Sequence, residues 1–368
     1  MDMPEFKVPL REQIASIAPY VPGKPIEEVE REYGITGASK IASNENPLGP
    51  SPKALEAVRR AASDLHRYPD GSAFRLRRAL AGKFGRPEEG ILLGNGSNEL
   101  LVLLAQCVLA PGDEVLFAQP SFVVYPLVTQ LFQAKAVTLP LRDDAHDLQA
   151  FSRALTPKSR LVFICNPNNP TGTAVSLLGI EALLKTCSPE TLVVLDEAYY
   201  EYVELKTYFE SLDILERYPN LAVLRTFSKA YGLAGLRVGY GFAHPALAAA
   251  VQKVRQPFNV NSLSLVGAEA ALGDGEFVAK AVALNARMRS RLQEGLRDLG
   301  FQPAPSQANF VYFRDTQAPA HYEALLRRGV IVRPMGTGAL RVTTGSEAET
   351  ERFLIALREI LGRSNGEP

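Results

Sequence analysis

The feature that most constrains the fold is an alternation, through the middle of the chain, of short apolar segments with amphipathic helical segments. Apolar runs that do not alternate with polar residues are typical of strands buried on both faces. Such strands, separated by helices, predict a mainly parallel sheet between helices, an α/β fold. The expected strands are residues 91–93, 114–117, 161–165, 192–195, 221–227 and 236–242, and the expected helices include residues 97–109 and 175–186.

The pattern changes after about residue 260. A long helical stretch at 275–299 is followed by a strand at 309–313, a helix at 318–328, short strands at 330–332 and 340–343, and a terminal helix from Glu347. A chain of 368 residues also exceeds the size at which a single hydrophobic core usually stops growing. We therefore expect a large domain (36–260), a smaller α+β domain (261–368), and an N-terminal arm (1–35) that packs on the smaller domain or on a partner subunit.

Ligands of such sheets bind beyond the carboxyl ends of the strands, so the residues that follow the strands are the candidates for chemistry. One expected strand ends at Thr226-Phe227-Ser228-Lys229, and Arg237 follows eight residues after the lysine. A lysine near an arginine is disfavoured as ammonium and is a candidate for imine chemistry. The hydroxyls and the guanidinium are suited to a phosphate. A single lysine taken alone is more often a solvated loop residue.

Another apolar strand ends at Asp196, with Tyr199 three residues later. A carboxylate at this position can hold a pyridine nitrogen protonated, and a phenol can hydrogen-bond a phenolate oxygen. The alternative is a magnesium-binding acid of a phosphate-transfer enzyme, but the chain has no P-loop lysine pattern.

Two further segments complete the set. The turn sequence that contains Asn169 follows the strand 161–165, and Gly94-Asn95-Gly96-Ser97-Asn98 forms a glycine turn that opens a helix and presents N–H groups to a phosphate. Each is weak evidence alone, because such turns are often structural.

In this order the four elements resemble those of the fold-type I pyridoxal-phosphate aminotransferases, over nearly the whole chain. The resemblance implies an enzyme with that fold and with pyridoxal 5'-phosphate as cofactor. It implies that Lys229 holds the cofactor as a Schiff base and moves the proton, with Asp196 and Tyr199 as the other catalytic residues. Phe122 matches the aromatic residue that stacks on the cofactor ring, where many relatives carry tyrosine. The remaining implied cofactor-binding residues are Gly96, Ser97, Asn98, Asn169, Thr226, Ser228 and Arg237.

More narrowly, the chain is similar to the histidinol-phosphate aminotransferase family. The similarity lies in residues 18–25 around Tyr20, in Asn44-Glu45-Asn46-Pro47, in Arg67-Tyr68-Pro69-Asp70, and near Arg333 and Arg341. In that family the tyrosine that matches Tyr68 reaches the active site of the neighbouring subunit, which implies that Tyr68 is a cofactor-binding residue and that the protein is a homodimer. Tyr20, Asn169, Arg333 and Arg341 are implied to bind the substrate.

The resemblance implies transamination between L-histidinol phosphate and 2-oxoglutarate in histidine biosynthesis. Glutamate and histidinol phosphate would share one site in a ping-pong cycle, because arginine forks accept carboxylate and phosphate alike. The alternatives are an aromatic amino-acid aminotransferase, a threonine-phosphate decarboxylase, and, from a different class, a non-catalytic pyridoxal-phosphate-binding regulator.

Charge and cysteine content narrow the remaining possibilities. A formal net charge of zero gives no electrostatic reason to expect nucleic acid or an anionic membrane as a partner. Three widely spaced cysteines form no metal pattern, so we expect no metal site, and they fit a reducing compartment. Without a signal segment or an apolar run of the ~20 residues that cross a bilayer, we expect a cytoplasmic protein.

Overall fold

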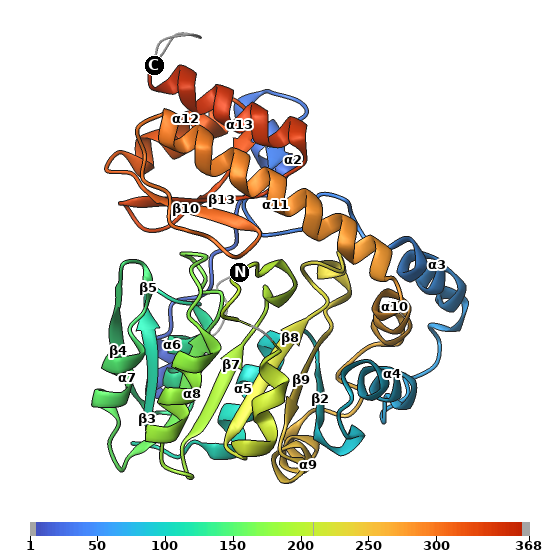
Figure 1. Ribbon diagram of the computed structural model, residues 1–368. Helices are drawn as coiled ribbons and strands as arrows, with labels where there is room; N and C mark the ends of the chain where they lie inside the picture. The colour runs from blue at the N-terminus through green and yellow to red at the C-terminus, as the bar shows by residue number, and fades with distance from the viewer. Residues whose placement is uncertain (1–4, 209, 363–368) are drawn as a thin grey trace.

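The computed structural model describes residues 5–208 and 210–362. An eight-stranded sheet forms its lower part, and a smaller unit with the long helix α11 lies above it (Figure 1). The strand order is β2-β9-β8-β7-β6-β3-β4-β5. The strands are β2 (Ile91–Gly94), β3 (Glu114–Gln119), β4 (Lys135–Arg142), β5 (Ala145–His146), β6 (Ser159–Cys165), β7 (Leu192–Asp196), β8 (Leu221–Thr226) and β9 (Gly239–Ala243).

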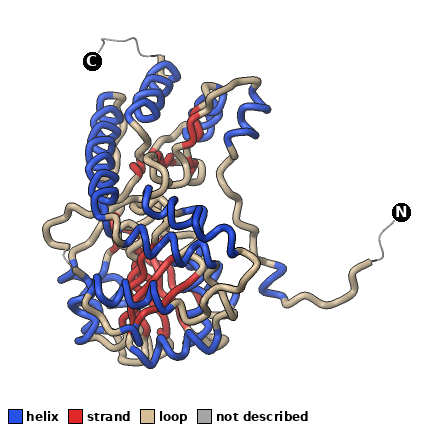
Figure 2. The backbone as a smooth tube through the Cα atoms, turned by 90° about the vertical axis from the view of Figure 1, so that its right-hand side faces the viewer, coloured by secondary structure: helices blue, strands red, loops and turns tan. Residues whose placement is uncertain are grey.

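The pairs from β8 through β7, β6 and β3 to β4 are parallel, whereas β2, β9 and β5 pair antiparallel. The expected α/β fold with a mainly parallel sheet is confirmed. Side chains of each central strand alternate between two hydrophobic cores, one on each face of the sheet. Figure 2 shows the strands between the two helical layers.

One core is covered by α5 (Ser97–Val108), α6 (Val124–Leu131) and α9 (Pro245–Val254). The other is covered by α4 (Phe74–Phe84), α7 (Leu148–Ala154), α8 (Leu177–Thr186) and α10 (Ser262–Leu272), with α3 (Pro52–Ala61) packed on α10. Short 3-10 helices complete this part: η1 (Ala62–Asp64), η2 (Glu88–Gly90), η3 (Tyr200–Tyr202), η4 (Ser211–Arg217) and η5 (Ala234–Leu236).

The smaller unit has a three-stranded antiparallel sheet with the order β10-β13-β12. Its strands are β10 (Phe310–Arg314), β12 (Arg333–Pro334) and β13 (Ala339–Thr343), and its helices are α11 (Gly275–Asp298), α12 (Ala318–Arg327) and α13 (Glu347–Ile360). These elements share a separate hydrophobic core.

The N-terminal segment contacts both parts of the structure. Helix α1 (Glu12–Ala15) lies against α6, where Gln130 Nε2 donates to Ser16 Oγ at 2.6 Å. Helix α2 (Ile26–Tyr33) lies on the smaller unit, and β1 (Ser39–Lys40) pairs in parallel with β11 (Val330–Ile331). Helix α2 contacts α12, where the Tyr33 hydroxyl donates a hydrogen bond to Glu323 at 3.1 Å. Beyond β1 the chain stays in contact with the smaller unit, because the Thr343 N–H donates to the Ile41 carbonyl at 2.8 Å and Asn309 donates to the Asn44 carbonyl at 3.0 Å.

Two sequence-based expectations differ from the structure in detail. The strand expected at 236–242 begins only at Gly239, because Ala234–Leu236 is a 3-10 turn and Arg237 adopts a left-handed backbone with φ 58°. Strand β4 is absent from the expected strands, because its apolar residues alternate with exposed ones, among them a proline, and do not form a continuous apolar run. Among the described residues, no helix is both long and apolar enough to span a bilayer.

Candidate active site

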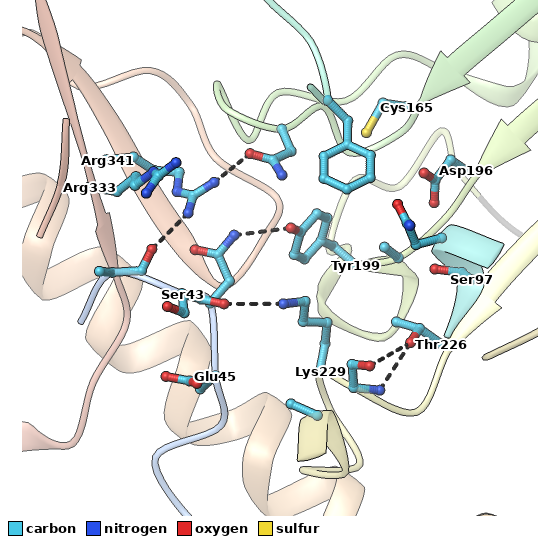
Figure 3. Close-up of a pocket in the computed structure, with 18 of the residues that line it drawn as sticks. Ser43, Glu45, Ser97, Cys165, Asp196, Tyr199, Thr226, Lys229, Arg333 and Arg341 are labelled. Atoms are coloured by element: carbon cyan, nitrogen blue, oxygen red, sulfur yellow. Dashed lines mark hydrogen bonds between the residues drawn. The ribbon is translucent and has the colours of Figure 1, made fainter. Parts of the chain in front are cut away.

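A cavity of about 300 Å³ lies where the carboxyl ends of β6, β7 and β8 meet the smaller unit (Figure 3). These three strands are parallel neighbours, so the residues that follow them converge at one edge of the sheet. Asn169 follows β6, Asp196 ends β7, and Ser228 and Lys229 follow β8. From the other side, residues of the smaller unit's strands close the cavity, including Arg333 of β12 and Arg341 of β13.

Lys229 projects into the centre of this cavity (Figure 3). Its Nζ atom donates a hydrogen bond to the Ser43 carbonyl at 3.3 Å. Burial disfavours the ammonium form and lowers the pKa of Lys229 to about 8. The positive charges of Arg341 and Arg237 lower this pKa as well, whereas the negative charge of Glu45 raises it. A lysine with such a pKa supplies a neutral amine near neutral pH, as nucleophilic and proton-transfer chemistry requires.

The two carboxylate oxygens of Asp196 differ in their hydrogen bonding. Its Oδ2 accepts a hydrogen bond from the Tyr125 hydroxyl at 2.9 Å, and its buried Oδ1 has no partner among the described residues. Burial raises the pKa of Asp196 to about 6, while the Tyr125 hydroxyl favours the ionised form. An unpaired buried oxygen at the cavity wall is suited to a positively charged N–H, such as that of a pyridinium ring.

The third part of the cavity is a set of donors around the start of α5. Gly96 precedes this helix with φ 80°, and a Cβ atom there would lie 2.4 Å from the Arg237 Nη2 atom. The Thr226 hydroxyl donates to Ser228 Oγ at 3.0 Å, and Arg237 Nη1 lies 3.5 Å from the same Ser228 Oγ. A helix N-terminus, two hydroxyls and an arginine form an arrangement suited to a phosphate group. Ser97 and Asn98 also line the cavity here.

Tyr199 also lines the cavity. Its hydroxyl accepts a hydrogen bond from Asn44 Nδ2 at 3.0 Å, and its ring lies 5.8 Å from Lys229 Nζ. Burial raises the pKa of the Tyr199 phenol, so it stays protonated and can donate to a ligand oxygen. Figure 3 shows Asp196, Tyr199 and Lys229 around one central space. A pyridine ring with a phosphate arm therefore fits the donor set.

Two arginines occupy the end of the cavity next to the smaller unit. Arg341 is buried and donates to Asn169 Oδ1 at 2.5 Å and to the Ala42 carbonyl at 2.8 Å, while its Nε has no partner among the described residues. Arg333 donates to the Val21 carbonyl at 2.9 Å and lies 5.6 Å from the ring centre of Tyr20. These groups present positive charge to any anionic end of a substrate.

The structure brings nearly all of the expected site residues together. Tyr20, Phe122, Asn169 and the residues named above line or border the cavity. Tyr68 does not: its side chain is 84% exposed and stacks on Phe258, with ring centres 4.9 Å apart. The sequence predicts no role for Tyr125, although it lies only one helical turn after Phe122. It predicts none for Asn44 or Glu45 either, although both belong to the Asn44-Glu45-Asn46-Pro47 motif.

Three comparisons with known proteins agree with one another. The family profile of aminotransferases of class I and II matches residues 38–357. The chain is 47% identical to histidinol-phosphate aminotransferase of Moorella thermoacetica, over 95% of this chain and 92% of that protein, and 49% identical to that of an Anaeromyxobacter species, over 95% and 98%. Among solved structures it resembles histidinol-phosphate aminotransferase of Sinorhizobium meliloti in complex with pyridoxal-5'-phosphate, with a TM-score of 0.88 and 30% identity over 96% of this chain and 97% of that one.

Proposed function

The chain belongs to the aminotransferases of class I and II, and we propose that it moves an amino group between L-histidinol phosphate and 2-oxoglutarate with pyridoxal 5'-phosphate as cofactor. Relatives that match 95% of the chain bear the name histidinol-phosphate aminotransferase, which favours this substrate over an aromatic amino acid or threonine phosphate. The observation that carries the proposal is the position of Arg333 and Arg341 at the end of the cavity that holds Lys229 and the unpaired Asp196 oxygen.

Pyridoxal phosphate, when bound, supplies a carbonyl that combines with amines and a ring that accepts the electron pair of the substrate carbon. Asp196 would hold the ring nitrogen protonated, and its ionised form would stabilise the positive charge there. Tyr199 and Asn169 would hydrogen-bond the ring's phenolic oxygen. The cluster of Ser97, Asn98, Thr226, Ser228 and Arg237, with the turn at Gly96, would bind the phosphate.

Lys229 would have two roles in the proposed transamination. Its neutral amine would hold the cofactor through the carbonyl carbon between turnovers. When the substrate amine has replaced it there, Lys229 Nζ would accept the proton from the substrate's amine-bearing carbon and deliver it to the cofactor's former carbonyl carbon. A pKa of about 8 suits the exchange, because neither protonation state is strongly favoured near neutral pH.

Arg341 and Arg333 would bind the phosphate of histidinol phosphate in one half-reaction and a carboxylate of glutamate in the other. A guanidinium fork accepts either anion through paired N–H donors. Tyr20, beside Arg333, would help to enclose the group. One site can thus serve both substrates without moving the lysine.

We also propose a cytoplasmic homodimer, and the arm (1–35), large domain (36–260) and small domain (261–368) as its structural parts. Several large apolar side chains are exposed in the single chain, among them Phe74 and the stacked pair Tyr68 and Phe258. A contiguous exposed apolar surface marks an interaction site. Sedimentation of the purified enzyme tests the dimer: a monomer at micromolar concentration would contradict it.

The function is tested by the absorbance of the cofactor-loaded enzyme before and after addition of L-histidinol phosphate without an amino acceptor. The proposal expects the visible band of the lysine-bound cofactor to disappear as the amino form accumulates, and 2-oxoglutarate to restore it. Lys229→Ala should fold and show neither the band nor turnover. Conversion by phenylalanine but not by histidinol phosphate would identify the aromatic alternative instead.

A further inference from the structure

Glu45 is a carboxylate on the cavity wall that the chemistry above does not use. In the described part of the chain, the cavity wall has two acidic residues, and Asp196 is the other. Glu45 has one weak partner, Lys40, whose Nζ lies 3.4 Å from Oε1, and 48% of its side chain is exposed. Charge-assisted hydrogen bonds are typically shorter, about 2.7–2.9 Å. The carboxylate therefore retains acceptor capacity toward the cavity.

The backbone on both sides of Glu45 is fixed. Asn44 has a left-handed backbone with φ 56° and is buried; its N–H donates to Thr343 Oγ1 at 2.9 Å and its carbonyl accepts from Asn309 at 3.0 Å. Asn46 donates to the Ala230 carbonyl at 3.0 Å, next to Lys229. A strained residue held by several hydrogen bonds is typical of functional sites. The position of Glu45 is consequently set by the fold rather than by a free loop.

The chain order of residues 42–45 gives their order along the cavity. The Ala42 carbonyl accepts from Arg341, the next carbonyl, that of Ser43, accepts from Lys229, and Glu45 lies beyond it. Figure 3 shows Glu45 and Arg341 on opposite sides of Ser43. From residue 42 to residue 45 the chain spans about 10 Å at most. Anion-binding arginines and an acidic group thus flank the lysine.

Histidinol phosphate has the same order of groups. Its amine-bearing carbon lies between a phosphate-bearing carbon and a carbon that bears an imidazole ring. With the phosphate on Arg341 and the amine carbon at Lys229, the ring extends toward Glu45. Imidazole has at least one N–H donor in either protonation state, and a carboxylate is the acceptor that also favours its cationic form.

We propose that the Glu45 carboxylate accepts a hydrogen bond from the imidazole ring of the substrate and makes the enzyme selective for imidazole-bearing amine phosphates. This inference rests on the proposed function. Asp196 cannot take this role, because it lies on the other side of Lys229 and faces the position of the cofactor ring.

The test compares three amino donors in half-reactions of the loaded enzyme: L-histidinol phosphate, L-phenylalaninol phosphate and L-glutamate. Phenylalaninol phosphate keeps the phosphate, the amine and a ring but lacks the ring N–H. Glu45→Ala should lower kcat/KM for histidinol phosphate roughly tenfold to a hundredfold. The values of kcat/KM for histidinol phosphate and phenylalaninol phosphate should then be close to equal. Glu45→Gln should lie between Glu45→Ala and the native enzyme, because its amide oxygen still accepts.

The matched control is Glu359→Gln. Glu359 also forms a loose surface pair, 3.3 Å from Arg328, and is 60% exposed, but it lies on α13 outside the cavity. Glu359→Gln should keep the native ratios of kcat/KM among the three donors.

Equal losses for all three donors in Glu45→Ala would overturn the inference, because Glu45 would then act through the pKa of Lys229. Unchanged selectivity would overturn it as well. If the native enzyme reacted with glutamate and phenylalanine but not with histidinol phosphate, the proposed function itself would fail, and the inference with it.

Discussion

The Tyr125 hydroxyl donates a hydrogen bond to one oxygen of Asp196 at 2.9 Å, while the other oxygen is buried without a partner among the described residues. The ring of Tyr125 stacks on Phe163 with centres 4.5 Å apart, so the hydroxyl has little freedom to move. Tyr125 therefore orients the carboxylate so that the unpaired oxygen faces the cavity, and it favours the ionised form against burial. We regard Tyr125 as a positioning residue for Asp196.

Tyr125→Phe should lower kcat about tenfold while leaving the fold intact, because the ring can keep its stack on Phe163. Removal of a donor to the charged form should raise the pKa of Asp196 further above its present value of about 6. The acid limb of the rate profile is then expected to move to higher pH. Steady-state rates between pH 5 and 9 measure both effects.

Tyr218→Phe is the matched control for this change, because the Tyr218 hydroxyl donates to the Glu181 carboxylate at 3.1 Å away from the cavity. Tyr218→Phe should keep the native kcat and the native dependence of the rate on pH. A Tyr125→Phe enzyme with an unmoved acid limb would show that Tyr125 does not influence Asp196.

Asp196→Asn should reduce turnover by orders of magnitude, because a neutral amide cannot stabilise a pyridinium charge. The substitution preserves shape and can still accept from Tyr125, so circular dichroism and thermal unfolding should change little. Pre-steady-state rates with histidinol phosphate and with glutamate should fall together. Full activity in this variant would refute the electron-sink role of Asp196.

The lowered pKa of Lys229 makes a prediction about pH. Only the neutral amine attacks a carbonyl, so the rate at which apoenzyme captures pyridoxal phosphate should rise with pH and level off above about 8. Stopped-flow absorbance of apoenzyme mixed with cofactor measures this rate. A rate that continued to rise toward pH 10 would indicate a lysine with the ordinary value of 10.5.

The central sheet and the residues at its strand ends could be predicted from the sequence, because each buried strand is a continuous apolar run that ends in a polar residue. Asp196 and Lys229 are such cases. Strand β4 could not be predicted in this way, because its apolar residues alternate with exposed residues, one of them a proline, and do not form a continuous run. The start of β9 was misplaced because the left-handed Arg237 interrupts an otherwise apolar run.

The supporting residues of the candidate site were beyond sequence reasoning for a different reason. Tyr125 and Asp196 are 71 positions apart, and Asn44 and Tyr199 are 155 apart. Their hydrogen bonds depend on tertiary packing, and neither periodicity nor spacing encodes such a pair. The place of Glu45 on the cavity wall likewise follows only from the path of residues 42–46 between the two sheets.

Gly96→Ala tests the phosphate-binding turn. A Cβ at this position would lie 2.4 Å from the Arg237 Nη2 atom, and the backbone φ of 80° is unfavourable for alanine. The guanidinium would have to move away from the start of α5, so the dissociation constant of pyridoxal phosphate, measured by equilibrium dialysis of apoenzyme, should rise by about tenfold or more. Gly235→Ala is the control, because a Cβ there meets no atom within 4 Å and should leave cofactor affinity unchanged. Equal affinities in the two variants would mean that Arg237 and the turn at Gly96 do not bind the phosphate together.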